Sequence, residues 1–134
     1  MNVEVTMTSR ATVDGECEET TLQAVGTWER TDEAITLRYT EAEGADVCVT
    51  VRPTQAVIER HGEVHSQMLL EEGKRHLCRY ETPYGRLMLH VQATRLRFAA
   101  DGEGGRLQAA YTREMSGAQT QHESEITIKE VSPC

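Results

Sequence analysis

Apolar and polar residues alternate along most of this chain, and a two-residue period is typical of a strand with one buried and one solvated face. The first segment shows the pattern clearly. Its odd positions hold Val3, Val5, Met7, Ala11 and Val13, and its even positions hold Glu4, Thr6, Thr8, Arg10 and Thr12. No stretch has the period of a long helix, so the sequence predicts an all-β fold.

Glycine, proline and aspartate residues divide the chain into short segments of this kind. The predicted strands are Asn2–Val13, Thr20–Arg30, Ala34–Thr40, Val47–Arg52, Gln55–Arg60, Glu63–Glu71, Arg75–Glu81, Arg86–Ala99, Leu107–Met115 and Glu123–Val131. We expect the strand Arg86–Ala99 to bend near Thr94, and the segment Asp101–Gly105 to be the most flexible turn. Because no linker or low-complexity segment interrupts the series, we expect one domain over residues 1–134.

About ten short antiparallel strands must close or fold over, because an open sheet of that width would expose its edges and one apolar face. The connections have hairpin length, which favours pairing between consecutive strands and thus an up-and-down β-barrel. A two-sheet sandwich is the alternative.

Charge and hydropathy limit the classes of partner. The 134 residues include 22 acidic and 14 basic residues, a formal net charge of -8. This charge repels phosphate backbones and anionic lipids, so we expect neither a nucleic-acid nor a membrane partner. The chain also has no signal-peptide pattern and no run of 18 apolar residues, and we expect a cytoplasmic protein.

The cysteines and histidines predict neither disulfides nor a metal site. Cys17, Cys48, Cys78 and Cys134 are widely spaced with no Cys-x-x-Cys pair, so free thiols are expected. Five histidines, His61, His65, His76, His90 and His122, could in principle bind a metal. A spacing of four on a strand separates His61 from His65 by about 13 Å, and only a tight turn at Gly62 would bring them closer.

Signals of catalysis are weak. The four aspartates lie in predicted turns, most of the glutamates occupy outward positions, and no serine has a nucleophile-elbow context. The glycines Gly102, Gly104 and Gly105 precede a strand instead of a helix, so they form no phosphate loop. We therefore expect no enzyme and no cofactor.

Several segments resemble a known family. They are Trp28, Ile35-x-Leu37-x-Tyr39, Val47-x-Val49-x-Val51, Thr82-Pro83-Tyr84-Gly85-x-Leu87, Tyr111 and Ser124-x-Ile126-x-Ile128. In this order they resemble the YwiB-like family of small bacterial proteins. The resemblance implies a calycin-type, lipocalin-like β-barrel of unknown function and supplies no catalytic residues.

Gly26-Thr27-Trp28 also matches the Gly-x-Trp signature of lipocalins. There the tryptophan packs against an arginine of a late strand, a position that Arg113 could fill here. The alternative is a tryptophan that only fills one end of the barrel.

Trp28 and two groups of polar residues are candidates for ligand binding. Tyr39, Tyr111 and Arg113 share the phase of apolar positions, so they either converge inside the barrel on an anionic or amphipathic ligand or lie at its ends. In the basic segment 74–97, Arg79, Arg95 and Arg97 either form a positive site or pair outside the barrel with glutamates.

These observations lead to two hypotheses. The first is a non-enzymatic barrel that binds a small apolar or anionic molecule in its lumen. The second is a structural or interaction module that forms a homodimer or docks a partner through a sheet face or edge.

Overall fold

A computed structural model describes residues 2–100 and 103–131, and these form ten antiparallel strands. The strands are β1 (Asn2–Val13), β2 (Glu16–Arg30), β3 (Ile35–Thr40), β4 (Asp46–Val51), β5 (Gln55–His61), β6 (His65–Glu71), β7 (Arg75–Thr82), β8 (Gly85–Ala100), β9 (Gly104–Met115) and β10 (Ala118–Glu130). All ten predicted strands are present. The predictions for Asp101, Gly102 and Cys134 lie outside the described residues.

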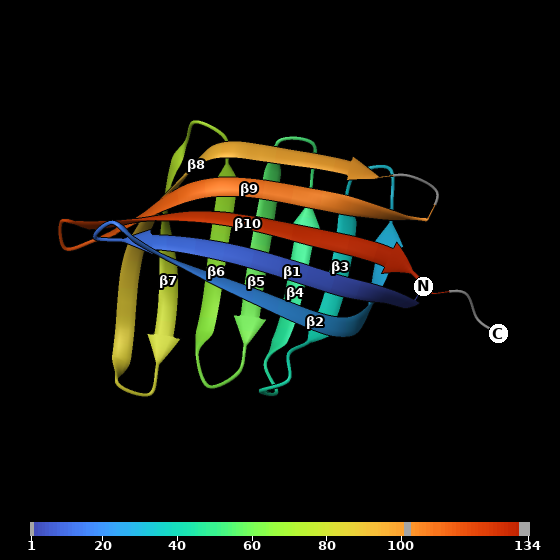
Figure 1. The fold of residues 1–134 in the computed structure, drawn as a ribbon, viewed down its shortest axis with the longest axis horizontal. Coiled ribbons are helices and arrows are strands. Elements are labelled where there is room, and N and C mark those ends of the chain that lie inside the picture. Colours follow the sequence, from blue (N-terminus) through green and yellow to red (C-terminus); the bar gives the residue numbers. More distant parts are fainter. Residues whose placement is uncertain (1, 101–102, 132–134) are drawn as a thin grey trace.

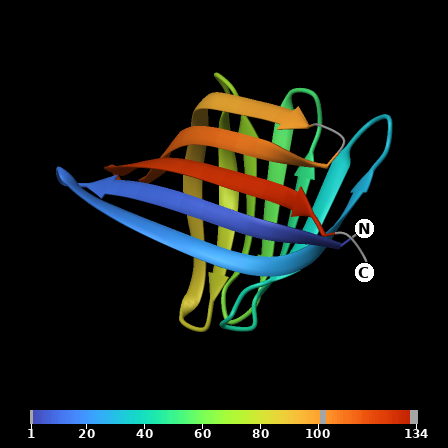
Figure 2. The same ribbon diagram turned by 45° about the vertical axis from the view of Figure 1, so that its right-hand side comes forward.

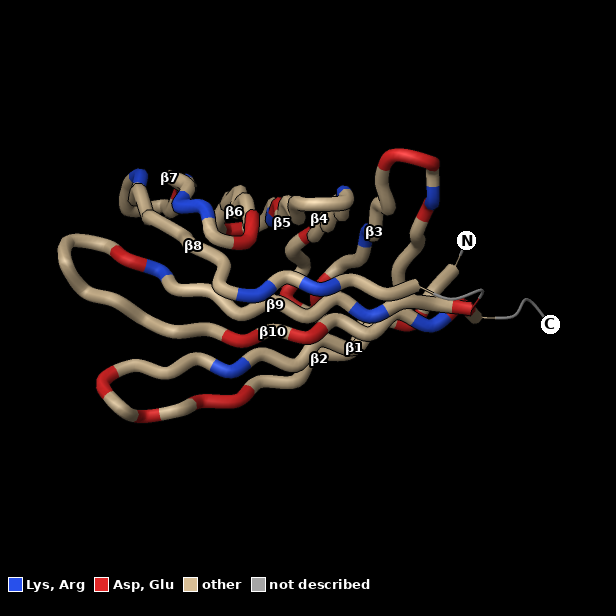
Figure 3. Tube along the Cα trace, turned by 90° about the horizontal axis from the view of Figure 1, so that it is seen from above, with Lys and Arg blue, Asp and Glu red and all other residues tan. Residues whose placement is uncertain are grey.

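The strands form a closed up-and-down barrel. Each strand pairs with its neighbours in the chain, and β1 pairs with β10 to close the ring. In Figure 1 the long strands β1, β2, β9 and β10 run across the shorter strands β3–β7, so the barrel is flattened into two crossing layers. Seen from above, these layers are distinct and the β1–β2 and β9–β10 hairpins extend along the same direction (Figure 3). The predicted barrel is confirmed.

The strands β2 and β8 each belong to both layers. In β2 a glycine lies where the strand begins to pair with the second layer, and in β8 the register of pairing shifts. β2 begins to pair with β3 at Gly26, where a Cβ atom would collide with the backbone carbonyl of Arg38. The first part of β8 pairs with β7 and the last part pairs with β9. The register with β9 shifts between Ala93 and Arg95, which is where the sequence predicted a bend near Thr94. Figure 2 shows β8 turning from one layer into the other.

The side chains of alternate residues fill the space between the layers. One cluster of buried residues surrounds Trp28 and Leu37, and a second surrounds Leu70 and Val91. Ile58 and Leu96 pack against both clusters and join them. Leu87 has the same phase on β8 as the buried Leu89 and Val91 but is 44% exposed. It lies two residues after the start of β8, beside the β7–β8 turn.

Within the described residues there is no helix that is long and apolar enough to cross a membrane. The cysteines Cys17, Cys48 and Cys78 are free thiols.

Candidate functional site

Arg113 projects into the barrel from β9 and meets an aromatic side chain of β7, the strand on the other side of β8. Its Nη2 atom donates a hydrogen bond to the hydroxyl of Tyr80 on β7. Its Cζ atom lies 5.2 Å from the ring centroid of Tyr80 and 6.0 Å from that of Tyr111. A guanidinium is attracted to the faces of aromatic rings, so the two tyrosines hold this cation in place.

Arg113 has no carboxylate partner in the part of the chain that the structure describes. Among the described residues, none of the aspartates or glutamates lies within ion-pair distance of its guanidinium, whereas Arg10, Arg60, Arg75, Arg79, Arg86, Arg97 and Arg106 each have such a partner. Arg38, Arg52 and Arg95 also form no ion pair within these residues, but these three side chains are exposed, whereas Arg113 is half-buried. The Nε atom of Arg113 is buried and also lacks a hydrogen-bond acceptor. An arginine in this position is costly for the protein unless an anion compensates its charge.

His122 completes the wall beside Arg113 without adding charge. Its ring is stacked on that of Tyr111, with centroids 5.2 Å apart and planes 11° apart, and its Nε2 atom lies 2.8 Å from Thr120 Oγ1. Burial, and then the nearby Arg113 cation, lower the pKa of His122 from 6.5 to about 4. The imidazole is therefore neutral at pH 7.

A second arginine acts on the same region. The pKa of the Tyr80 hydroxyl is raised by burial and pulled down by the Arg113 and Arg60 cations, so both lie within electrostatic reach of this tyrosine. Arg60 Nε forms an ion pair with Glu41 Oε1 at 3.1 Å, and this carboxylate neutralises it. One net positive charge thus remains among Arg60, Arg113 and Glu41.

Tyr39 also points inward and is buried, but its hydroxyl contacts Met7 Sδ at 3.8 Å and not Arg113. Burial, and then the nearby Glu41 carboxylate, raise the pKa of Tyr39 to about 12, an effect that Arg60 partly offsets. We define the lumen site by Arg113, Tyr80, Tyr111 and His122. Of the residues predicted to converge inside the barrel, Tyr111 and Arg113 do so.

Trp28 is buried in the first core cluster, away from the lumen site. Its Nε1 atom donates a hydrogen bond of 3.0 Å to Glu130 Oε1, and Arg30 Cζ lies 4.4 Å from its ring centroid. Arg113, which could have filled the position of the lipocalin arginine, contacts Tyr80 and Tyr111 and not Trp28. Arg30, two residues along the same strand, projects from the same side of β2 and takes that position.

Arg79, Arg95 and Arg97 do not form one positive site. Arg79 lies on β7 and is the register partner of Met88, in the part of β8 before its bend. Arg95 and Arg97 lie on β8 after the bend, where this strand pairs with β9. All three side chains are exposed. Arg79 Nη1 lies 3.6 Å from Glu81 Oε1 and Arg97 Nη1 lies 2.8 Å from Glu72 Oε1, so these two follow the alternative of outward pairing with glutamates.

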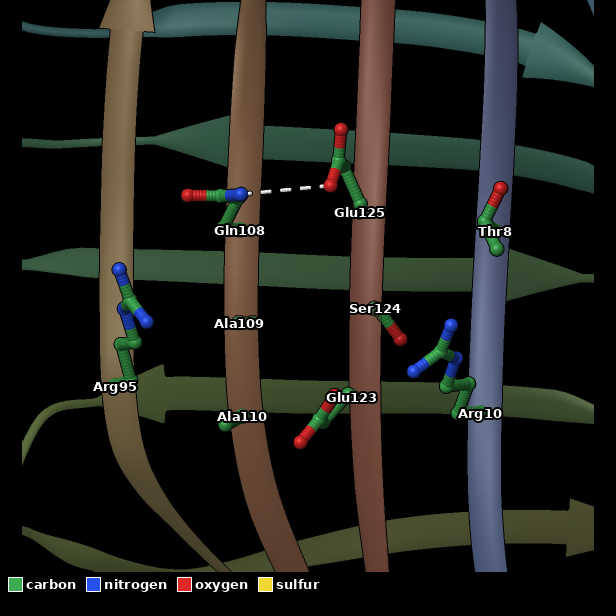
Figure 4. Close-up of a pocket in the computed structure, with 9 residues that line it drawn as sticks. All are labelled: Thr8, Arg10, Arg95, Gln108, Ala109, Ala110, Glu123, Ser124 and Glu125. Carbon is green, nitrogen blue, oxygen red and sulfur yellow. Dashed lines mark hydrogen bonds between the residues drawn. The ribbon is translucent and has the colours of Figure 1, made fainter. Parts of the chain in front are cut away.

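Arg95 lines a hollow on the outer face of β8, β9, β10 and β1 (Figure 4). The hollow also contains Arg10, Glu123 and Glu125, and Gln108 Nε2 donates a bond of 3.4 Å to Glu125. Arg10 is paired with Glu19 at 2.9 Å. Acidic and basic side chains both line this solvated surface, so it has no preference for an anionic or a cationic ligand. We therefore favour the lumen site as the candidate binding site.

Sequence reasoning missed Tyr80 and His122. Tyr80 shares its phase with the buried Cys78, but the exposed Leu77 lies in the opposite phase and obscures the inward face of β7. His122 shares its phase with Ile126 and Ile128, and extending the last predicted strand backwards past Glu123 would have shown it.

His61 and His65 follow the second alternative, a tight turn at Gly62. β5 and β6 make a hairpin around this turn, and the Nδ1 atoms of the two histidines lie 3.3 Å apart.

Comparisons with known proteins agree with the fold and name no activity. A family profile described as a domain of unknown function (DUF1934) matches residues 5–128. The chain is similar to the crystal structure of the ywiB protein from Bacillus subtilis, with a TM-score of 0.87 and 20% sequence identity over 98% of this chain and 92% of that one. A search of curated proteins found no match. The chain belongs to the DUF1934 family of unknown function, and its fold is that of the YwiB-like barrels.

Proposed function

We propose that this protein binds the anionic group of a small molecule at the lumen site. The observation that carries the proposal is the state of Arg113, a cation inside the barrel with a buried Nε and no carboxylate partner in the described part of the chain. Arg113 is half-buried, and a partly buried charge without a counter-ion favours an anionic ligand.

The surrounding groups suit a carboxylate or a phosphate. Arginine presents a planar fork of N–H donors that matches two oxygens of either group. The Tyr80 hydroxyl accepts a bond from Nη2 and keeps its own proton, which it can donate to the same anion. Since Nε is buried, a ligand that uses it must displace the side chain slightly from its present position.

An apolar part of the ligand would find matching surface nearby. Leu87 is opposite Tyr80 in the β7–β8 pair and is 44% exposed. The aromatic faces of Tyr111 and Tyr80 border the guanidinium. The ligand class that fits these groups is an amphipathic anion.

A matched set of probes tests this proposal. We expect sodium decanoate, titrated calorimetrically into the protein, to bind saturably, and decanol and decyltrimethylammonium to bind at least tenfold more weakly. Arg113→Met should abolish decanoate binding. Arg95→Met removes the same charge from the outer surface and should leave binding unchanged. Equal binding of all three probes, or equal loss in both variants, would overturn the proposal.

We also infer a reducing cytoplasmic compartment. The free thiols of Cys17, Cys48 and Cys78 support this inference, because disulfides form mainly in oxidising compartments. We infer a binding protein without catalytic activity.

A further inference from the structure

The β5–β6 hairpin brings two histidines together on the outside of the barrel. His61 is the last residue of β5 and His65 is the first of β6. The register pairs Arg60 with Ser66, so the next position of the ladder places His61 opposite His65. Directly opposed residues of an antiparallel pair have Cβ atoms about 4.5–5.5 Å apart, so both imidazoles can reach one point between them.

The distance between the two rings suits a shared metal ion. The Nδ1 atoms lie 3.3 Å apart, with ring centroids at 5.5 Å and an interplanar angle of 64°. Two nitrogens bound at about 2.0–2.1 Å to one tetrahedral zinc ion lie about 3.3–3.4 Å from each other. Both side chains are exposed, so the rings can turn their Nδ1 lone pairs from each other towards a common ion.

The backbone of the turn is held in place. A Cβ atom added to Gly62 would lie 2.9 Å from the Cβ of Ala45, which shows that the β5–β6 turn packs closely against the β3–β4 turn. This packing fixes where the two strands end, and with them the Cα positions of His61 and His65. A site held in this way loses less conformational entropy on binding a metal than one on a free loop.

Neighbouring carboxylates make the location favourable for a cation. Glu59 Oε2 lies 3.9 Å from His61 Nε2, and Asp46 on β4 is the register partner of His61. Among the described residues, no group of three histidine, cysteine or acidic side chains is arranged to hold a metal. The ion would therefore have two protein ligands and complete its coordination with water.

We propose that His61 and His65 chelate one divalent transition-metal ion through their Nδ1 atoms, at a site separate from the lumen site. Imidazole nitrogen is a preferred ligand of Zn²⁺, Ni²⁺ and Cu²⁺. The proposal concerns the outer face of the hairpin and stands whether or not the lumen binds an anion.

Calorimetric titration of the whole chain with Zn²⁺, under reducing conditions at pH 7.5, tests it. We expect one ion per chain and at least a tenfold loss of affinity in both His61→Ala and His65→Ala. His90→Ala removes another exposed histidine, on β8, and should bind like the parent protein, as should Arg113→Met.

The nearby thiol provides a second control. Cys48 is the register partner of Glu59 on the adjacent strand, so a zinc ion could instead bind there. Cys48→Ser should retain Zn²⁺ binding, and nitrogen NMR of the histidines should show coordination at Nδ1 of both residues. Binding that survives both alanine variants, binding lost only in Cys48→Ser, or no binding at all would each overturn the proposal.

Discussion

Arg113 on β9 donates a hydrogen bond from Nη2 to the hydroxyl of Tyr80 on β7, and this bond links two strands that are not adjacent in the barrel. It is the only hydrogen bond found for the Arg113 side chain among residues 2–100 and 103–131. The cation is thus positioned by a neutral group and is not neutralised by it, which suits a residue that receives an anion.

Replacing Arg113 should abolish ligand binding without lowering the stability of the fold. We expect Arg113→Met to unfold at the same or a higher urea concentration than the parent protein, because an apolar side chain of similar length removes an unpaired charge from a partly buried position. The measurement is urea denaturation followed by tryptophan fluorescence. A loss of more than about 2 kcal/mol would show that the arginine contributes to the fold instead.

Removing the acceptor should have the opposite effect on stability. In Tyr80→Phe the guanidinium loses its hydrogen bond while the ring remains, and we expect a loss of about 1–3 kcal/mol. In the double variant Arg113→Met/Tyr80→Phe this penalty should largely disappear, since no cation is left without a partner. Strictly additive effects in the same denaturation assay would show that the two side chains are not coupled.

His122 should make the protein less stable in mild acid. Its pKa is 6.5 when unperturbed and about 4 in the folded protein, so between these values the unfolded chain binds a proton that the folded chain excludes. The free energy of unfolding should therefore fall as the pH is lowered from about 6.5 towards 4. His122→Phe preserves the stack on Tyr111 and should reduce this dependence. An unchanged pH profile in the variant would assign the effect to other groups.

Trp28 should be a large contributor to stability. It is buried, its Nε1 atom binds Glu130 on β10, and Arg30 covers its ring. We expect Trp28→Ala to cost about 3–5 kcal/mol. Tyr84→Ala removes a fully exposed aromatic residue and should change stability by less than about 0.5 kcal/mol. Similar losses in the two variants, measured by thermal or urea unfolding, would contradict this assignment.

The alternation of side chains is sufficient to predict most of the fold. It places Val3, Val5 and Ile128 on one face, and the structure buries all three where β1 and β10 close the barrel. It also places Tyr111 and Arg113 on the inward face of β9, where they lie together. A strand has only two faces, so the period decides between inside and outside directly.

The partners of these residues depend on which strands face each other across the lumen, and the period along one strand contains no such information. The sequence for this reason does not reveal that Arg113 meets Tyr80. The contact of Arg30 with Trp28 lies within β2, where two residues of the same phase project from one side of the strand. The contact between His61 and His65 is different, because it follows from the register of one hairpin. Treating 55–71 as a hairpin with its turn at Gly62 would have predicted it.

The most direct test of an uncompensated cation in the lumen is nitrogen NMR of the arginine side chains during titration with sodium decanoate. We predict that the Arg113 Nε–H resonance shifts progressively and saturates, while the Arg95 resonance stays unchanged and decyltrimethylammonium has no effect on either. An Arg113 resonance that does not respond to decanoate at concentrations up to its solubility limit would contradict the account.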